Sequence, residues 1–433
     1  MQRTNYACGT AEHGLRRRGF LGALAGSAVA GSTVVGGLGW LTRGMAAETI
    51  KTSDMRVLVF NMHGGLSQLE SWDPKPGTKT GGPCRAIPTS VPGIHISELL
   101  PYTAQQMHHL CLMRGVNTSE DDHGKGAYMM LTGRRQTPAA DYPQIGSVTA
   151  KMLADEKQTL PGHIIITPGA GGGRGNEAAY LGPRYSSISL DGQKPPQYSA
   201  KPDGLSDESE KRRHAFRERI NAEFLNRGRT AITDAYTYSY DQALRLMERR
   251  DVFDLNKESV SDQERYGKHD LGRQCLLARR LLTNGVSFVQ VTHSNYDTHN
   301  ENFNFHLEQL GEFDKPFATL IADLNTLGLL EKTLVVVLSE FGRTPNINLY
   351  YGRDHWSKAW TVVLGGAKIA RGAVFGKTNE EGREVVDGQV DHGALFHTYL
   401  QAVGVDSTES LIVDGRELPL ADPAAKPIWK VLV

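Results

Sequence analysis

Short apolar runs without polar alternation recur along the chain and predict its buried strands. Continuous, β-branched runs of this kind are typical of strands covered on both faces in a parallel sheet. Segments with apolar residues at helical spacing separate the runs, so that strands and helices alternate. The pattern predicts an α/β fold with a mostly parallel sheet sandwiched by helices. The expected strands lie at residues 55–62, 110–114, 163–167, 286–293, 334–338 and 360–364.

The helical segments fall into two groups. Those with an apolar stripe are expected to pack on the sheet. Segments 206–225 and 233–249 are strongly charged and predict solvated helices of an insert or cap within residues 183–265. Pro316 is expected to kink or restart the helix in which it lies. The apolar helices are expected at residues 99–109, 124–131, 145–153, 271–282, 313–327 and 390–403.

Carboxylates and imidazoles stand where several of the expected strands end or begin. Glu340 follows one strand, Asp297 and His299 follow another, and Asp354 and His355 precede a third. In open α/β sheets, ligands bind at the carboxyl edge of the strands. Mixed oxygen and nitrogen donors suit a divalent or transition metal. The sequence therefore predicts a metal site, with loop-capping acids and surface histidines as the alternative interpretation.

Glycine-rich segments follow two other strands. Gly64 and Gly65 come directly after His63 at the end of the first strand, where a glycine pair permits a tight turn or a close approach to a ligand. Residues 169–175 are also rich in glycine but lack the lysine of a nucleotide P-loop, so we expect a flexible surface loop. His123 precedes a short helix, whose N-terminus would favour an anion.

The composition excludes one class of partner. Lys plus Arg and Asp plus Glu both number 48, so the formal net charge is zero. Nucleic-acid binding needs a basic surface, and we therefore expect no nucleic-acid partner. Cys84, Cys111 and Cys275 are scattered through the chain after residue 47, which is neither a disulfide framework nor a CxxC metal motif.

Residues 1–47 have the pattern of an export signal. Arg17-Arg18-Gly19-Phe20-Leu21 matches the twin-arginine motif, and a Gly/Ala-rich apolar run follows it to residue 41. We expect recognition by the twin-arginine export machinery, cleavage near Ala47, and a periplasmic or secreted protein without a stable membrane span. An uncleaved membrane anchor is the alternative, although the Gly and Ser content makes the run a poor one.

A set of motifs spread over nearly the whole chain after residue 47 resembles the domain-of-unknown-function 1501 family. These are secreted, sulfatase-like proteins of the alkaline phosphatase superfamily, and the resemblance implies an alkaline-phosphatase-like fold for residues 48–433. The motifs are His63-Gly64-Gly65, Asp73-Pro74-Lys75-Pro76, Leu131-Thr132-Gly133-Arg134, Tyr180-Leu181-Gly182-Pro183, Asp297-Thr298-His299, Ser339-Glu340-Phe341-Gly342-Arg343-Thr344-Pro345 and Gly352-Arg353-Asp354-His355-Trp356.

The resemblance also implies roles for single residues. His63 lies where the superfamily has a metal-binding Asp, Asp297 and His299 are similar to its Asp-and-His pair, and His355 resembles its final metal-binding His. Glu340, with Ser339 before it, stands at the position of a second Asp-His pair. His123 falls where sulfatases place the cysteine that matures to formylglycine and where phosphatases place Ser or Thr. Formylglycine chemistry is therefore not expected.

These observations lead to a predicted activity and two alternatives. We expect a hydrolase of phosphate or sulfate esters, with a small-molecule or glycan ester as substrate and zinc, calcium or manganese as its metal. One alternative is a secreted binding or scaffold protein that retains the fold without turnover. The other, suggested by the resemblance alone, is an enzyme specialised for sulfated polysaccharides. The expected metal ligands are His63, Asp297, His299, Glu340, Asp354 and His355.

Three further residues are expected to take part in the reaction. His123 could be a ligand, a general acid or base, or a nucleophile. Arg343 and Arg353 could pair with the anionic ester, because a guanidinium fork fits a tetrahedral oxyanion. The alternative interpretation of each arginine is a structural ion pair.

Overall fold

The computed structural model describes residues 54–138, 140–153, 158–192, 195, 199, 204–226, 230–413 and 415–433. The chain divides into two compact units, Met1–Thr49 and Ile50–Val433. The predicted export signal lies outside the described residues, and the description below concerns the second unit.

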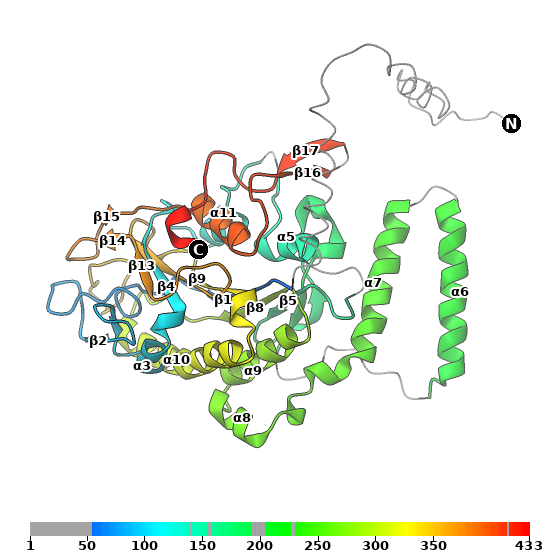
Figure 1. Ribbon diagram of the computed structural model, residues 1–433, viewed down its shortest axis with the longest axis horizontal. Coiled ribbons are helices and arrows are strands. Elements are labelled where there is room, and N and C mark those ends of the chain that lie inside the picture. The colour runs from blue at the N-terminus through cyan, green and yellow to red at the C-terminus, as the bar shows by residue number, and fades with distance from the viewer. Residues whose placement is uncertain are drawn as a thin grey trace, which may run out of the picture. The chain divides into compact units, whose positions relative to one another are not determined.

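The described part of this unit is built on a nine-stranded sheet with the order β13-β4-β12-β9-β1-β8-β5-β7-β6 (Figure 1). Most neighbouring strands are parallel, which confirms the predicted α/β class. The strands are β1 (Arg56–Met62), β4 (Leu110–Val116), β5 (His163–Ile166), β6 (Gly171–Arg174), β7 (Ile188–Leu190), β8 (Phe288–His293), β9 (Thr333–Leu338), β12 (Trp360–Gly365) and β13 (Ala373–Phe375).

Two layers of helices cover the sheet, because successive residues of its central strands face opposite sides. Phe60 of β1 packs edge-on against Phe313 and Phe317 of α10, with ring centroids 5.7 and 5.1 Å apart. Its neighbour Val59 belongs to the core on the other side, together with Phe396 of α11. The first layer contains α3 (Pro101–Gln105), α8 (Val260–Tyr266), α9 (Asp270–Thr283) and α10 (Asn302–Thr326), and the second contains α4 (His123–Thr132), α5 (Ile145–Met152) and α11 (His392–Ala402) (Figure 1).

Two local expectations differ from the structure. Helix α10 continues through Pro316, so the expected restart there is wrong, whereas a kink at the proline stays a prediction. The stacked rings of Phe313 and Phe317, 4.8 Å apart, hold the turns on both sides of the proline against the sheet. The glycine-rich segment 169–175 contains the strand β6, which pairs antiparallel with β7 at the edge of the sheet. Glycines in an edge strand are tolerated there, because little side-chain packing is required.

The prediction of two charged helices is confirmed. They are α6 (Asp207–Asn226) and α7 (Thr230–Glu248), and Arg245 of α7 donates a hydrogen bond of 2.8 Å to the main-chain oxygen of Gln158. Strand β7 also lies within residues 183–265, but it pairs with β5 in the central sheet. That α6 and α7 act as a cap stays a prediction.

The remaining strands form small ribbons outside the central sheet. The ribbons are β2 (Ala86–Pro88) with β3 (His95–Ser97), β10 (Gly342–Arg343) with β11 (His355–Trp356), β14 (Lys377–Thr378) with β15 (Val385–Asp387), and β16 (Ser410–Val413) with β17 (Arg416–Pro419).

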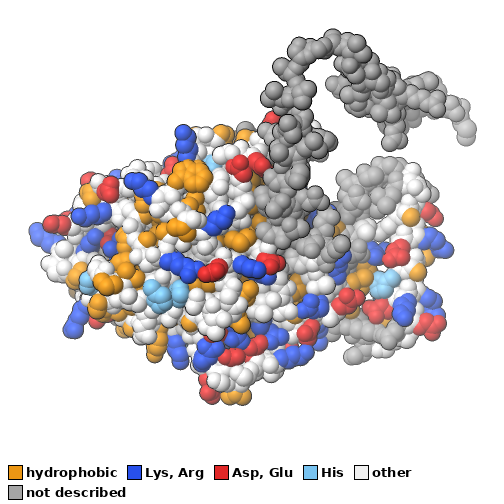
Figure 2. Space-filling view, viewed as in Figure 1, with side chains coloured by type: hydrophobic (Ala, Val, Ile, Leu, Met, Phe, Trp, Pro, Cys, Tyr) orange, Lys and Arg blue, Asp and Glu red, His pale blue; other side chains and the backbone are white. Residues whose placement is uncertain are grey.

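The described surface carries charges of both signs. On the face seen in Figure 2, acidic and basic side chains are interspersed over the described surface. Among the described helices, none combines the length and apolar character needed to cross a membrane.

The direction of β12 determines what lies at the carboxyl edge of the sheet. This strand is antiparallel to β9 and to β4, so it begins where those two strands end. The segment before β12, which contains His355, therefore lies at the same edge as the segments that follow β1, β4, β8 and β9. The residues after β1, β4 and β8 meet there with residues 339–359, which connect β9 to β12.

Candidate metal centre

Three histidines at this edge hold their rings in the same way. His123 is the first residue of α4, His299 follows β8, and His355 is the first residue of β11. In each ring, Nδ1 is hydrogen-bonded over 2.7 Å to a protein oxygen. The acceptors are Oε1 of Glu340 for His123, Oδ1 of Asp354 for His299, and the main-chain oxygen of Asp121 for His355.

The opposite nitrogens of the three rings face the carboxylate of Asp297. Its Oδ1 lies 3.1 Å from Nε2 of His299 and 3.3 Å from Nε2 of His355, and its Oδ2 lies 3.4 Å from Nε2 of His123. The Nε2 atoms of His299 and His355 are themselves 3.0 Å apart. Ligand atoms of His123, Asp297 and His355 also lie within 4.8 Å of one another. Asp297 is thus the centre of the cluster.

The chemistry of these donors fits a cation. An imidazole whose Nδ1–H donates to an oxygen carries its lone pair on Nε2 when it is neutral. The three Nε2 lone pairs would then face one another and a carboxylate, which is unfavourable unless a proton or a metal ion lies between them. Nε2 of His123 is moreover buried without a hydrogen-bond partner. Metal-binding histidines commonly donate their second nitrogen to a carboxylate or a main-chain oxygen, as all three rings do here.

Arg343 fixes the position and charge of Asp297. Its side chain is fully buried, and Nη2 lies 2.6 Å from Oδ1 of Asp297. The same guanidinium donates to the main-chain oxygens of Gly64, Gly65 and Arg353. Partial burial alone would raise the pKa of Asp297, but the hydrogen bond and charge of Arg343 outweigh it and lower that pKa to about 2. The carboxylate is therefore anionic at neutral pH. Arg343 orients Asp297, and most of its donors are occupied by the protein.

Glu340 supports His123. Its buried carboxylate accepts hydrogen bonds from the main-chain nitrogen of Gly64 at 2.9 Å and from Oγ of Ser339 at 3.0 Å, besides the one from His123. Burial opposes ionisation of Glu340, yet the hydrogen bond with His123 and the other contacts lower its pKa overall. The same hydrogen bond raises the pKa of His123 above its ordinary value. Expected as metal ligands, Glu340 and Asp354 instead contact the Nδ1 atoms of His123 and His299.

Arg353 lies in a different environment from the one expected. Both Arg353 and Glu70 are 0% exposed, and their side chains form an ion pair with Nη2 2.7 Å from Oε1. The remaining N–H groups donate to the main-chain oxygens of Thr80, Thr344 and Pro345. All five donors of the guanidinium are therefore used within the protein. The expectation that Arg353 binds an anionic ester is corrected, because the structure gives it the role of a buried ion pair.

His63 lies at the rim of the cluster. Its side chain is exposed, and its ring is nearly parallel to that of His123 with the centroids 6.2 Å apart. The structure thus places His63 beside the other imidazoles but gives it no contact with Asp297.

Two supporting features were not expected from the sequence. The ring of Phe341 stacks on His355 with a centroid separation of 4.4 Å and lies 4.8 Å from the ring of His123. Gly64 has φ of +117°, and a Cβ atom there would lie 2.6 Å from the main-chain nitrogen of Asp297. The glycine pair after the first strand can be recognised in the sequence, but its close approach to the main chain of Asp297 cannot. Nothing in the spacing of Phe341 distinguishes it from an ordinary core residue.

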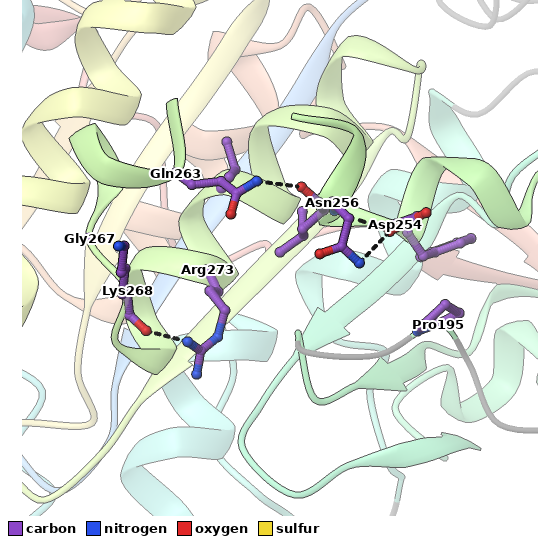
Figure 3. Close-up of a pocket in the computed structure, with 10 residues that line it drawn as sticks. Pro195, Asp254, Asn256, Gln263, Gly267, Lys268 and Arg273 are labelled. Carbon is purple, nitrogen blue, oxygen red and sulfur yellow. Dashed lines mark hydrogen bonds between the residues drawn. The ribbon is translucent and has the colours of Figure 1, made fainter. Parts of the chain in front are cut away.

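A separate pocket of about 310 Å³ lies between residues 253–256, which precede α8, and the residues of α8, α9 and their connection (Figure 3). None of the residues predicted as catalytic or metal-binding lines this pocket. Its polar side chains bond largely to their own surroundings, as Gln263 does to the main-chain oxygen of Leu255 and Asn256 to Asp254. The lining residues are Pro195, Phe253, Asp254, Leu255, Asn256, Gln263, Gly267, Lys268, Arg273 and Leu276.

Comparison with known proteins relates almost the whole described chain to one family. The model of the family described as "Protein of unknown function (DUF1501)" matches residues 54–432. No curated protein matches the chain. Solved structures similar to this chain include the PsFucS1 sulfatase from Pseudoalteromonas sp., with 14% identity, coverage of 84% of this chain and 72% of that one, and a TM-score of 0.40.

Two other similar structures have comparable scores. The C-terminal periplasmic domain of EcEptC from Escherichia coli, in complex with Zn, is 10% identical, with coverage of 82% of this chain and 84% of that one and a TM-score of 0.41. The alkaline phosphatase from the Antarctic bacterium TAB5 is 14% identical, with coverage of 82% and 99% and a TM-score of 0.35.

Proposed function

The chain belongs to the DUF1501 family, and we propose that it is a metal-dependent hydrolase of phosphate or sulfate esters. The observation that supports this proposal best is the common orientation of His123, His299 and His355. Each ring commits Nδ1 to a protein acceptor and directs Nε2 at Asp297. Convergence of three Nε2 atoms on one anionic carboxylate suits a cation bound among them.

Three of these side chains would hold the cation. The atoms are Nε2 of His299, Nε2 of His355 and Oδ1 of Asp297, whose mutual separations are 3.0, 3.1 and 3.3 Å. Two nitrogen donors with one oxygen donor favour zinc or manganese over calcium, which prefers an all-oxygen shell. A divalent cation bound there would supply Lewis-acid polarisation of an ester oxygen.

His123 is placed to move a proton. Its Nε2 is directed at the cluster, and the hydrogen bond from Nδ1 to Glu340 favours the protonated ring. In ester hydrolysis, His123 would donate the Nε2 proton to the leaving oxygen as that oxygen separates from phosphorus or sulfur. Arg343 would keep Asp297 ionised and correctly oriented throughout, and the hydrogen bond from Nδ1 of His299 to Asp354 would fix the orientation of that ring.

The proposal includes export of the protein. Its support is the sequence of residues 1–47, with the twin-arginine motif at Arg17 and Arg18 followed by an apolar run. A periplasmic or secreted hydrolase would meet phosphate and sulfate esters of small molecules or of glycans.

The test combines metal analysis with activity. We expect the purified full chain to contain a stoichiometric divalent metal and to hydrolyse at least one of a panel of phosphate and sulfate monoesters. The substitution His299→Ala should remove the metal and the turnover together, whereas His95→Ala, at an exposed position of β3, should change neither. A chain that binds no metal and hydrolyses neither class of ester would contradict the proposal and favour a non-catalytic binding protein.

A further inference from the structure

Three consecutive apolar side chains project into solvent next to the metal centre. Leu349, Tyr350 and Tyr351 are 95%, 72% and 69% exposed. They lie between β10 and β11, the ribbon that carries Arg343 and His355. Large apolar side chains rarely gather at the surface without a ligand or partner to cover them.

The side-chain amide of Asn348 anchors the segment to the metal centre. Its Nδ2 donates to the main-chain oxygen of His299 at 2.9 Å and lies 3.4 Å from Oδ1 of Asp354. Its Oδ1 accepts from the main-chain nitrogens of Tyr350 and Gly352, both at 2.9 Å. Four hydrogen bonds are the full capacity of an Asn side chain. One amide thus joins the tyrosine segment to a histidine of the centre and to its supporting carboxylate.

Main-chain contacts fix the same segment along the residues that follow His299. The nitrogens of Glu301 and Asn302 donate to the oxygens of Tyr350 and Tyr351 at 3.1 and 3.0 Å. Tyr351 adopts φ of +57°, a conformation that a bulky residue rarely keeps unless its surroundings impose it. A Cβ atom on Gly352 would collide with the main-chain oxygen of His299. The exposed side chains are therefore presented by a firmly held backbone.

The segment is also within reach of a substrate at the metal centre. Tyr351 and His355 are four residues apart, which limits the distance between their Cα atoms to about 14 Å even for an extended chain.

We propose that residues 349–351 form a recognition loop for the organic part of the ester, with a ring of the substrate stacking on Tyr350. Asn348 is the positioning residue that holds this loop in a fixed position relative to His299. The inference rests on the proposed hydrolase function and specifies its substrate class as esters of ring-bearing alcohols, either aromatic or sugar rings. Tyrosine suits this task because it offers a large, rigid and amphipathic face with little loss of side-chain freedom.

The experiment compares esters with and without a ring, and the difference in their intrinsic reactivity cancels when the same pair is assayed on two protein variants. Wild-type full chain and Tyr350→Ala are assayed with 4-nitrophenyl phosphate and glycerol phosphate, and with 4-nitrophenyl sulfate and methyl sulfate. We expect Tyr350→Ala to lower the preference for the ring-bearing ester, measured as the ratio of the two kcat/KM values, by about tenfold through KM. Tyr350→Phe should restore the preference, because it keeps the ring.

Two further variants separate recognition from general damage. Tyr102→Ala removes another surface tyrosine, 50% exposed in α3, and should leave the ratio of kcat/KM values unchanged. Asn348→Asp replaces two donors by an acceptor that faces the carboxylate of Asp354. It should raise KM for the ring-bearing ester and also lower kcat, because the main chain at His299 loses its anchor. An unchanged ratio in Tyr350→Ala would overturn the proposal.

The outcome also distinguishes this inference from the proposed function. If the wild type hydrolyses none of the four esters, the hydrolase proposal fails, and the recognition loop is judged by binding alone. Calorimetry then compares 4-nitrophenyl phosphate with inorganic phosphate. A wild-type preference for the ring-bearing compound that Tyr350→Ala loses supports the loop, whereas equal preferences in the two proteins refute it.

Discussion

His123 and Glu340 are joined by a hydrogen bond of 2.7 Å between Nδ1 and Oε1, although 217 positions separate them in the chain. The pair connects the first turn of α4 to the end of β9. It also determines which nitrogen of His123 faces Asp297. The orientation of the His123 ring is thus set by a carboxylate that is itself almost fully buried.

Replacing this carboxylate by its amide should impair the centre without unfolding the protein. Glu340→Gln keeps the shape of the side chain but removes the charge that favours protonated His123. Loss of such a supporting carboxylate typically lowers metal affinity or activity by about 10- to 100-fold. We expect a reduction of kcat/KM in that range, with a far-ultraviolet circular dichroism spectrum like that of the wild type. Glu308→Gln, at an exposed position of α10, serves as the matched control.

The buried pair of Arg353 and Glu70 should contribute to stability more than to catalysis. Both side chains are 0% exposed, and removal of one partner from such a pair costs about 3–5 kcal/mol. We expect Glu70→Gln and Arg353→Met each to lower the free energy of unfolding by an amount of that order, as measured by urea denaturation. The double variant should be less destabilised than the sum of the two. A variant that kept wild-type stability and lost only turnover would show that Arg353 acts on the substrate.

A methyl group at Gly64 should disturb the centre through the main chain of Asp297. Gly64→Ala places Cβ 2.6 Å from the nitrogen of Asp297, at a φ of +117° that L residues avoid. Gly77→Ala is the matched control, because Gly77 also has a positive φ of +76° but faces open space. We expect the control to lose about 1 kcal/mol of unfolding free energy and to retain its metal. Gly64→Ala should lose more stability and part of its metal, and equal behaviour of the two variants would contradict the contact.

The stability of the protein should depend on pH through His163, which is distant in the fold from the metal centre. Burial lowers the pKa of His163 to about 4, whereas the unfolded chain has a histidine pKa of about 6.5. Between these values the unfolded state binds the extra proton, so the free energy of unfolding increases with pH. The stabilising contribution is complete above about pH 6.5 and decreases as the pH falls toward 4.

The measurement is urea denaturation of the wild type and of His163→Gln at several pH values. Between pH 4 and 6.5, His163 should make the free energy of unfolding of the wild type increase by up to about 1.4 kcal/mol per pH unit. His163→Gln should lack this contribution to the increase. Its absolute stability will also be lower, since His163 packs against Phe288 and donates a hydrogen bond of 3.1 Å from Nδ1 to the main-chain oxygen of Tyr185. Parallel pH curves for the two proteins would show that His163 titrates normally in the folded state.

Much of the fold and the membership of the candidate centre could be predicted from the sequence. Buried strands such as β9 are recognisable because five consecutive residues, 334–338, are apolar, and residues that follow parallel strands must share one edge. The position of His355 needed more than this rule. It precedes β12, and only the antiparallel direction of β12 brings it to the edge where β9 ends. Strand direction depends on tertiary pairing, which the apolar pattern of a single run does not encode.

The division of labour among the site residues could not be predicted. Glu340 and Asp297 are both acids at strand ends, yet one contacts an Nδ1 atom and the other three Nε2 atoms. This difference depends on ring orientation, which is determined by contacts between distant segments. Arg353 shows the same limit, because its partner Glu70 lies 283 positions away in the sequence.

The pairing of β10 with β11 has a consequence for how this protein can diversify. Arg343 is opposite His355 in that ribbon, so the eleven intervening positions leave and re-enter the scaffold at one fixed point. Changes at the exposed positions 349–351 would alter which substrates reach the candidate centre, whereas Asn348 and Asp354 in the same stretch must remain to hold His299 in place. Natural or engineered relatives with other substrate preferences should therefore differ first at positions 349–351.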